Sequence, residues 1–217
     1  MNKLFSLDSK FMRVMSRVGD LILLNLLYIV TCIPIITIGA ATTALYTVTF
    51  RFGTDREEGT VKSYLDAFRS NFKQATLLWL LMLFILLASF FNTFLFWLMP
   101  TDMRYTAVVF VILFLVAYFM CTFAFPLLSQ FDSKNKLIFK NSLIMSLGYL
   151  PRTLLMAAMS MLPWILLLTD IILFLQLSFL WFMIYFALTA YINTKILHKV
   201  FAPYMTELED FEQEGSI

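Results

Sequence analysis

The chain has 217 residues, of which 61% are hydrophobic and 14% are charged, and its formal net charge is +2. A soluble domain usually carries about a quarter charged residues, so this chain has too little polar surface to cover a water-facing globule. No aromatic and basic array of the kind that binds nucleic acid is present. The composition therefore predicts an all-α protein whose helices lie in a lipid bilayer.

The first apolar stretch, residues 21–50, follows a basic leader and is too long for one simple span. The segment Pro34–Gly39 interrupts it, because proline removes a helical hydrogen bond and glycine permits a sharp bend. In lipid the freed carbonyl groups need other partners, and the hydroxyl groups of Thr31 and Thr37 can supply them. The stretch is either one kinked span or a short hairpin of two helices, over about residues 14–33 and 35–52, and we favour the hairpin.

A polar segment, residues 51–60, separates this stretch from a predicted amphipathic helix. Apolar residues at spacings of three and four place one face of that helix toward the membrane, while charged residues occupy the other faces. We expect this helix to lie along the membrane surface. Its apolar face consists of Val61, Leu65, Phe68, Phe72 and Ala75.

Four clear spans follow, because each is an apolar run close to the roughly 20 residues that cross about 30 Å of hydrocarbon. A second interfacial helix is expected in the later half of residues 130–151, and Thr169–Asp170 is interpreted as the tip of a hairpin. We treat residues 1–200 as one transmembrane domain and residues 201–217 as an acidic, flexible tail. The four spans are residues 74–99, 105–128, 154–168 and 171–192.

The distribution of lysine and arginine predicts the orientation. Short cytoplasmic loops carry the excess of these residues, and here they concentrate in residues 1–20, 51–73 and 134–152. Segment 100–105 carries one lysine or arginine residue, and segment 169–170 carries none. The sequence thus predicts a multi-pass membrane protein with five to six transmembrane helices, six being favoured. Both termini and one or two interfacial helices would be cytoplasmic.

No motif indicates a reaction. The chain contains no Walker phosphate loop, no H-E-x-x-H and no G-x-S-x-G sequence. Cys32, Cys121 and His198 stand apart from other metal-ligating residues, so we expect neither a metal nor another cofactor. Asn25 and Asn92 are polar groups within spans. They either form hydrogen bonds between helices or line a path for a polar solute such as a sugar.

Two sequence blocks resemble a known family. Residues 25–46, which include the string Ile33-Pro34-Ile35-Ile36-Thr37-Ile38-Gly39, and the block Phe68–Thr76 are similar to the signatures of YesL-like bacterial membrane proteins. The resemblance extends over about residues 18–80. It implies an uncharacterised family that is found beside carbohydrate ABC importers in Gram-positive bacteria. It does not extend to the permease itself, whose cytoplasmic loop has no counterpart in this sequence.

We therefore expect a non-enzymatic accessory subunit that binds the permease subunits of an oligosaccharide importer, with the bilayer as its other partner and an oligosaccharide as a candidate ligand. A small transporter or channel for a polar solute that acts alone is the alternative, and an intramembrane enzyme is the third hypothesis. The expected contact surfaces are the break at residues 34–43 and the basic elbow, residues 51–73. Their candidate residues, for partner binding or for structure, are Pro34, Thr37, Gly39, Thr42, Thr43, Arg69, Asn71 and Lys73.

Overall fold

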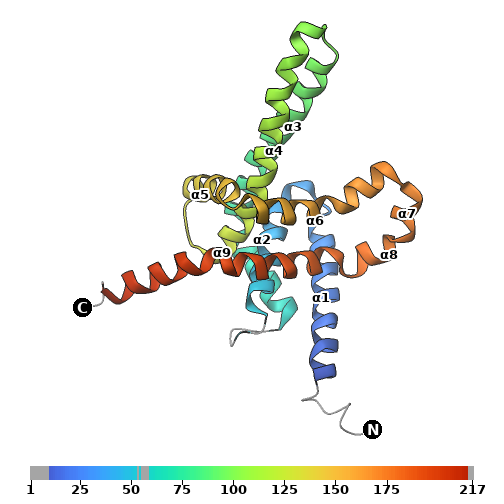
Figure 1. The fold of residues 1–217 in the computed structure, drawn as a ribbon. Helices are drawn as coiled ribbons and strands as arrows, with labels where there is room; N and C mark the ends of the chain where they lie inside the picture. The colour runs from blue at the N-terminus through green and yellow to red at the C-terminus, as the bar shows by residue number, and fades with distance from the viewer. Residues whose placement is uncertain (1–9, 53, 55–58, 215–217) are drawn as a thin grey trace.

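The computed structural model describes residues 10–52, 54 and 59–214, and every regular element in these residues is a helix (Figure 1). The side chains of residues 10, 101–103 and 205–214 lie outside this description. Five of the described helical segments are long and apolar enough to cross a membrane. These are Phe11–Cys32, Thr60–Trp97, Arg104–Gln130, Leu150–Thr169 and Ser178–Tyr204. The all-α class predicted from the sequence is confirmed, and the five apolar helices fit the predicted membrane-embedded protein.

The first apolar stretch folds back on itself. Helix α1 (Lys10–Cys32) ends before Pro34, a 3-10 turn η1 (Ile35–Thr37) follows, and helix α2 (Ile38–Arg51) runs back beside α1 (Figure 1). The chain therefore reverses at the break instead of continuing as one kinked helix. Helix α2 has 14 residues and a length of about 21 Å, which is shorter than the hydrocarbon layer. Whether α2 counts as a sixth crossing stays a prediction.

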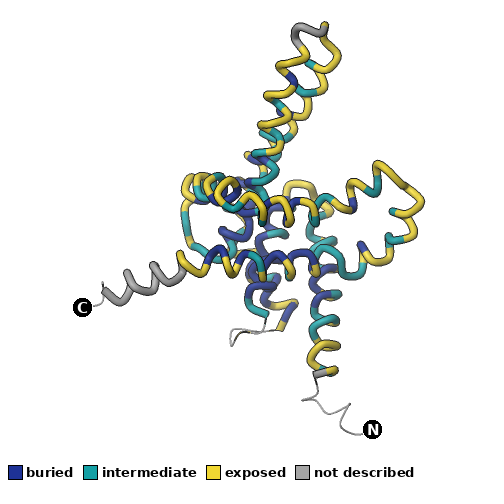
Figure 2. The backbone as a smooth tube through the Cα atoms, viewed as in Figure 1, coloured by how far each residue is buried: buried dark blue, intermediate teal, exposed yellow. Residues whose placement is uncertain are grey.

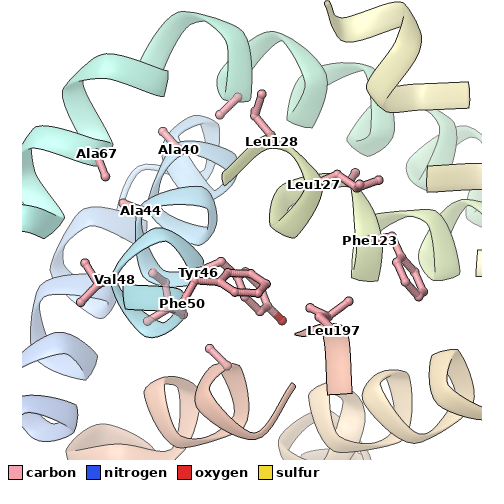
Figure 3. Close-up of a cluster of buried hydrophobic side chains, with 14 of the residues drawn as sticks. Ala40, Ala44, Tyr46, Val48, Phe50, Ala67, Phe123, Leu127, Leu128 and Leu197 are labelled. Carbon is pink, nitrogen blue, oxygen red and sulfur yellow. The ribbon is translucent and has the colours of Figure 1, made fainter. Parts of the chain in front are cut away.

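Helix α2 is the centre of the molecule. It packs against α1, α3, α4 and α9, and 11 of its residues are buried. Figure 3 shows its small residues Ala40 and Ala44 beneath α3, and its aromatic residues Tyr46 and Phe50 on the side of α4 and α9. A short helix is tolerated at this depth because neighbouring helices, and not lipid, surround its polar backbone ends.

Helix α3 (Thr60–Trp97) contradicts the expectation of a separate surface helix before the second span. Its 38 residues form one continuous helix of about 57 Å. No glycine or proline interrupts the sequence between its ends, so nothing favours a bend at the predicted boundary. The expected apolar face was also displaced by about one residue, since Val61 and Phe72 are exposed. The face that packs against the body is Thr60, Tyr64, Ala67, Ala75, Leu78 and Met82.

Two hairpins project from the packed body. The α3–α4 arm joins the end of α3 to the start of α4 (Thr101–Gln130), and the α6–α8 arm joins α6 (Leu150–Thr169), α7 (Ile171–Gln176) and α8 (Ser178–Leu180) (Figure 1). Figure 2 shows that both arms are largely exposed, whereas the buried residues gather where the helices cross. The arms leave the body in different directions, and their outer surfaces are apolar side chains.

The remaining elements close the body. Helix α5 (Asn135–Gly148) lies where the second interfacial helix was expected, with Leu137, Ile144 and Leu147 exposed. Asp170 separates α6 from α7, as a hairpin tip should, and its carboxylate accepts a hydrogen bond from the Leu173 backbone N–H. A π-helical turn η2 (Trp181–Tyr185) then leads into α9 (Phe186–Glu214).

The packed body extends past the domain boundary expected at residue 200. Phe201 is fully buried and packs against the rings of Phe50 and Phe131. Helix α9 continues to Glu214. Residues 215–217 of the expected acidic tail lie outside the described residues.

Candidate functional site

The segments expected to be cytoplasmic meet at one end of the body. The guanidinium of Arg17 in α1 lies 4.2 Å from the ring centre of Phe52, and Thr60 at the start of α3 donates a hydrogen bond to Asp20. Gln74 of α3 donates to the carbonyl of Ser133, which precedes α5. The tips of both arms lie away from this end (Figure 1). We call the end of the body where these contacts lie the basic face, and its side of the membrane stays a prediction.

A polar cavity opens on this basic face. It has a volume of about 560 Å³ and lies between the C-terminal end of α2, the first turns of α3 and the C-terminal end of α4. Arg51 lies on its wall with two carboxylates, Asp66 and Asp132. Its remaining polar lining is Thr47, Ser70, Asn71, Gln74, Ser129 and Gln130. Positively charged, negatively charged and neutral hydrogen-bonding groups therefore surround a space large enough for a small polar molecule or a partner's side chains.

The three candidate residues of the basic elbow fall into two groups. Asn71 lines the polar cavity, and its amide donates to the carbonyl of Ala67 and to the hydroxyl of Ser70. Arg69 and Lys73 are exposed and do not line the cavity. They point to the surroundings of the protein, where headgroups of anionic lipids would attract them. Asp55, Arg56, Glu57 and Glu58 of this elbow lie outside the described residues.

The break between α1 and α2 is held by threonine hydroxyl groups. The hydroxyl of Thr37 lies 2.6 Å from the carbonyl oxygen of Thr31 and 2.7 Å from that of Pro34. The hydroxyl of Thr31 contacts the carbonyls of Leu27 and Tyr28, one turn earlier in α1. The Thr31 carbonyl, which lies in the last turn of α1 and has no helical N–H four residues later, is thereby satisfied inside the protein, which the hydrocarbon could not do.

Helix α3 fixes the break from the other side. The indole N–H of Trp79 donates to the carbonyl of Ile35 over 2.8 Å, and the hydroxyl of Tyr64 lies 2.6 Å from that of Thr31. Neither residue was among the candidates expected from the sequence. The spacing of Tyr64, Ala67, Ala75 and Leu78 along one helix face contained the signal, since small residues there allow α2 to approach.

The candidates Gly39, Thr42 and Thr43 lie where α2 meets α3 and α1. A Cβ atom on Gly39 would lie 2.5 Å from the Cβ of Trp79 and 2.6 Å from the carbonyl oxygen of Ala75. Only glycine therefore fits at this contact. Thr42 and Thr43 bond through their hydroxyl groups to carbonyls one turn earlier in α2. These groups consequently serve α2 itself.

Asn25 joins the first helix to the last. Its amide N–H groups donate to the carbonyls of Trp181 and Phe182 over 3.1 and 2.7 Å, and its carbonyl accepts from the Ala187 N–H over 3.0 Å. The two carbonyls belong to the π-helical turn, where the regular helical bonds are rearranged, and the N–H group belongs to the first turn of α9. Of the two readings left open for Asn25, the structure supports a hydrogen bond between helices.

A second cavity, of about 770 Å³, lies between the bases of the two arms. Helix α1 supplies Tyr28 and Ile33, α2 supplies Tyr46, and the α6–α8 arm supplies Trp164 and Phe174. Most of the lining is apolar. We call this space the apolar cavity. Helix α2 separates it from the polar cavity, because Tyr46 lines one and Thr47 lines the other.

The structure also places the metal-ligating side-chain types of the described residues. Within them, no group of three or more His, Cys, Asp and Glu side chains could hold a metal ion. Cys32 and Cys121 are free thiols. Asp170, the acidic residue nearest to a span centre in the sequence, is exposed and caps α7. The distinctive features of the site are thus its two cavities and the break between them.

The comparisons with known proteins point to the same region. Residues 21–93 match the family described as "Protein of unknown function, DUF624". The match covers about a third of the chain and includes the break, α2 and most of α3. No curated protein and no solved structure matches the chain. The similarity is therefore to an uncharacterised family of membrane-type sequences, and it falls on the elements that form the centre of the body.

Proposed function

We propose that this chain is a non-catalytic accessory subunit that binds the permease of a carbohydrate ABC importer in the bacterial plasma membrane. The kind of partner comes from the resemblance of residues 18–80 to YesL-like proteins. The match to a family of unknown function over residues 21–93 supports that resemblance without adding a substrate. The α3–α4 arm provides the surface that would bind the partner, and the exposed apolar face of this arm is the observation on which the proposal rests.

The α3–α4 arm has an apolar face that nothing in the described chain covers. Its residues follow each other at spacings of three and four along the second half of α3, so they form one stripe. Helices associate in lipid through close packing and hydrogen bonds, and a long straight arm offers both. Asn92 and Thr93 lie beside the stripe and bond only to their own helix. The stripe is Phe84, Leu87, Phe91, Phe94 and Leu98, which are 56–71% exposed.

The basic face has a different role in this proposal. Exposed lysine and arginine residues of α3 and α5 meet the anionic headgroups of the inner leaflet and orient the protein. The polar cavity, with Arg51 facing Asp66 and Asp132, receives a loop of the permease that carries charges of both signs. The arm provides the contact within the membrane, and the cavity provides the contact at its surface.

Affinity purification in mild detergent tests the proposal. The tagged wild-type chain should retain ABC permease subunits, identified by mass spectrometry. The triple substitution Phe84→Ala, Phe91→Ala and Phe94→Ala on the arm should reduce their recovery at least about tenfold, as expected for a loss of about 1.4 kcal/mol or more. Three matched apolar substitutions on the other arm, Leu168→Ala, Leu175→Ala and Phe179→Ala, serve as the control and should retain the permease. Recovery of the wild-type chain without any permease subunit would contradict the proposal.

The alternative is a transporter or channel that acts alone. The observation that favours it is the position of α2, whose residues Tyr46 and Thr47 line cavities on opposite sides of the same helix. A movement of α2 would join the two spaces into a path. Liposomes that contain only the purified chain should then show flux of a polar solute such as a radiolabelled disaccharide. Liposomes with an Asn71→Leu variant should show less flux, because this residue lines the polar end.

A further inference from the structure

The apolar cavity has an exposed rim and a buried floor. Its rim includes Ile33, Trp164 and Phe182, which are 75%, 63% and 58% exposed. Its floor includes Tyr46 and Asn193, which are 8% and 1% exposed. In a bilayer the rim side chains meet hydrocarbon, so the cavity is reached from lipid and ends at two polar side chains.

Asn193 has an unused hydrogen-bonding atom on this floor. Its amide N–H donates to the hydroxyl oxygen of Tyr46 over 3.2 Å. Its carbonyl oxygen is buried and accepts no hydrogen bond from any described group. A buried acceptor without a donor is rare in folded proteins and destabilises them, so such an atom requires an explanation.

Tyr46 supplies the complementary group. Its hydroxyl oxygen already accepts a bond from Asn193, and no described group accepts its proton. The floor therefore presents one acceptor, the Asn193 carbonyl oxygen, next to one donor, the Tyr46 O–H. A single alcohol group both donates and accepts, so it satisfies both atoms at once.

Further hydroxyl groups of the cavity are already engaged, and those of Tyr28 and Thr42 contact each other. Tyr118 donates to the carbonyl of Ala157, Ser160 donates to that of Met156, and Tyr185 donates to that of Met159. A sugar with many hydroxyl groups would bury most of them without partners in this largely apolar space. A hydrocarbon chain with one small alcohol head fits the chemistry of the walls and the floor.

We propose that the apolar cavity binds a membrane amphiphile with a single uncharged hydroxyl head, such as a long-chain alcohol, whose hydroxyl group bonds to Asn193 and Tyr46 while its hydrocarbon chain leaves between the two arms. The volume of about 770 Å³ lies within the range of cavities that hold ligands of this size. This assignment adds a lipid ligand to the chain and does not depend on the importer proposed above.

Photolabelling of the full chain in nanodiscs tests the site. The probe is a long-chain alcohol with a diazirine in its hydrocarbon chain, and the matched probe is its methyl ether. In the wild type, peptides that contain Cys32, Trp164 or Phe182 should be labelled at least about fivefold more by the hydroxyl probe, since one neutral hydrogen bond is worth about this factor. Equal labelling by both probes, or labelling confined to the α3–α4 arm, would overturn the proposal.

Two variants separate the site from general lipid contact. Asn193→Leu removes the acceptor at similar volume and should abolish the difference between the probes. The control Asn92→Leu alters an amide of the α3–α4 arm that bonds only to its own helix, and it should leave the difference unchanged. Ser160→Phe fills the cavity from α6 and should lower labelling by the hydroxyl probe to the level of its ether. A difference between probes that persists in both Asn193→Leu and Ser160→Phe would refute the site.

Discussion

The substitution Gly39→Ala tests the close contact of α2 and α3. The new Cβ atom would lie 2.5 Å from the Cβ of Trp79 and 2.6 Å from the carbonyl oxygen of Ala75. Neither neighbour can rotate away, because both positions are fixed by the α3 backbone. The helices must separate by about 1 Å to restore ordinary contact, and overpacking of this kind costs about 1–3 kcal/mol.

The separation also lengthens the hydrogen bond from Trp79 to Ile35, now 2.8 Å, which is worth about 1 kcal/mol. The higher helix propensity of alanine offsets about 1 kcal/mol of this loss. Gly39→Ala should therefore lower the free energy of unfolding by about 1–3 kcal/mol.

Unfolding of the purified protein by SDS in mixed micelles, followed by tryptophan fluorescence, measures this change. The control is Gly19→Ala in α1, where a Cβ atom would meet nothing within 4 Å. This variant should be as stable as the wild type or more stable by up to about 1 kcal/mol. If Gly39→Ala and Gly19→Ala unfold at the same SDS fraction, the close contact at Gly39 is not a determinant of the fold.

Three other predictions concern the hydrogen bonds and the membrane itself. Asn25→Leu should destabilise the protein by about 2–4 kcal/mol in the same assay, because it leaves buried backbone groups of the π-helical turn without partners, whereas Asn92→Leu should change stability by less than about 1 kcal/mol. Thr37→Val removes two short bonds at the break and should cost about 1–3 kcal/mol. Its control, Thr169→Val, alters an exposed hydroxyl that bonds within its own helix and should cost about 0.5 kcal/mol or less. The intact chain should stay in the membrane fraction after washing with alkaline carbonate, and its release would contradict a membrane-embedded fold.

The overall class and the interruptions of the chain could be predicted because they depend on local chemistry. Proline at position 34 removes a helical hydrogen bond and, with Gly39 close behind, favours a break, and the position of Asp170 in a long apolar run predicted a tip that the structure contains. The threonines near the break were predicted to serve its carbonyl groups, and Thr37 does so. These inferences required only the sequence within about one helical turn on either side of the residue.

The arrangement of the helices could not be predicted, because it depends on contacts between distant segments. Hydropathy treats every apolar residue alike in lipid, so it did not distinguish α2, which is enclosed by protein, from a helix that faces lipid. For the same reason the predicted boundary between the surface helix and the span at residues 74–99 was wrong, since α3 is one continuous helix. The cavities depend on pairs such as Tyr46 and Asn193, 147 positions apart, which no periodicity relates.

The three hydrogen bonds of Asn25 have a consequence for the assembly of the protein during its synthesis. Their partners in the last helical segment follow Asn25 by 156 to 162 positions. At about 5–20 residues per second, a ribosome takes roughly 8–30 s to cover that distance. For this interval the nascent chain holds an amide in the bilayer whose final partners do not yet exist. The insertion machinery, or a water molecule that enters with the first helix, must supply hydrogen-bond partners for this amide until translation is nearly complete.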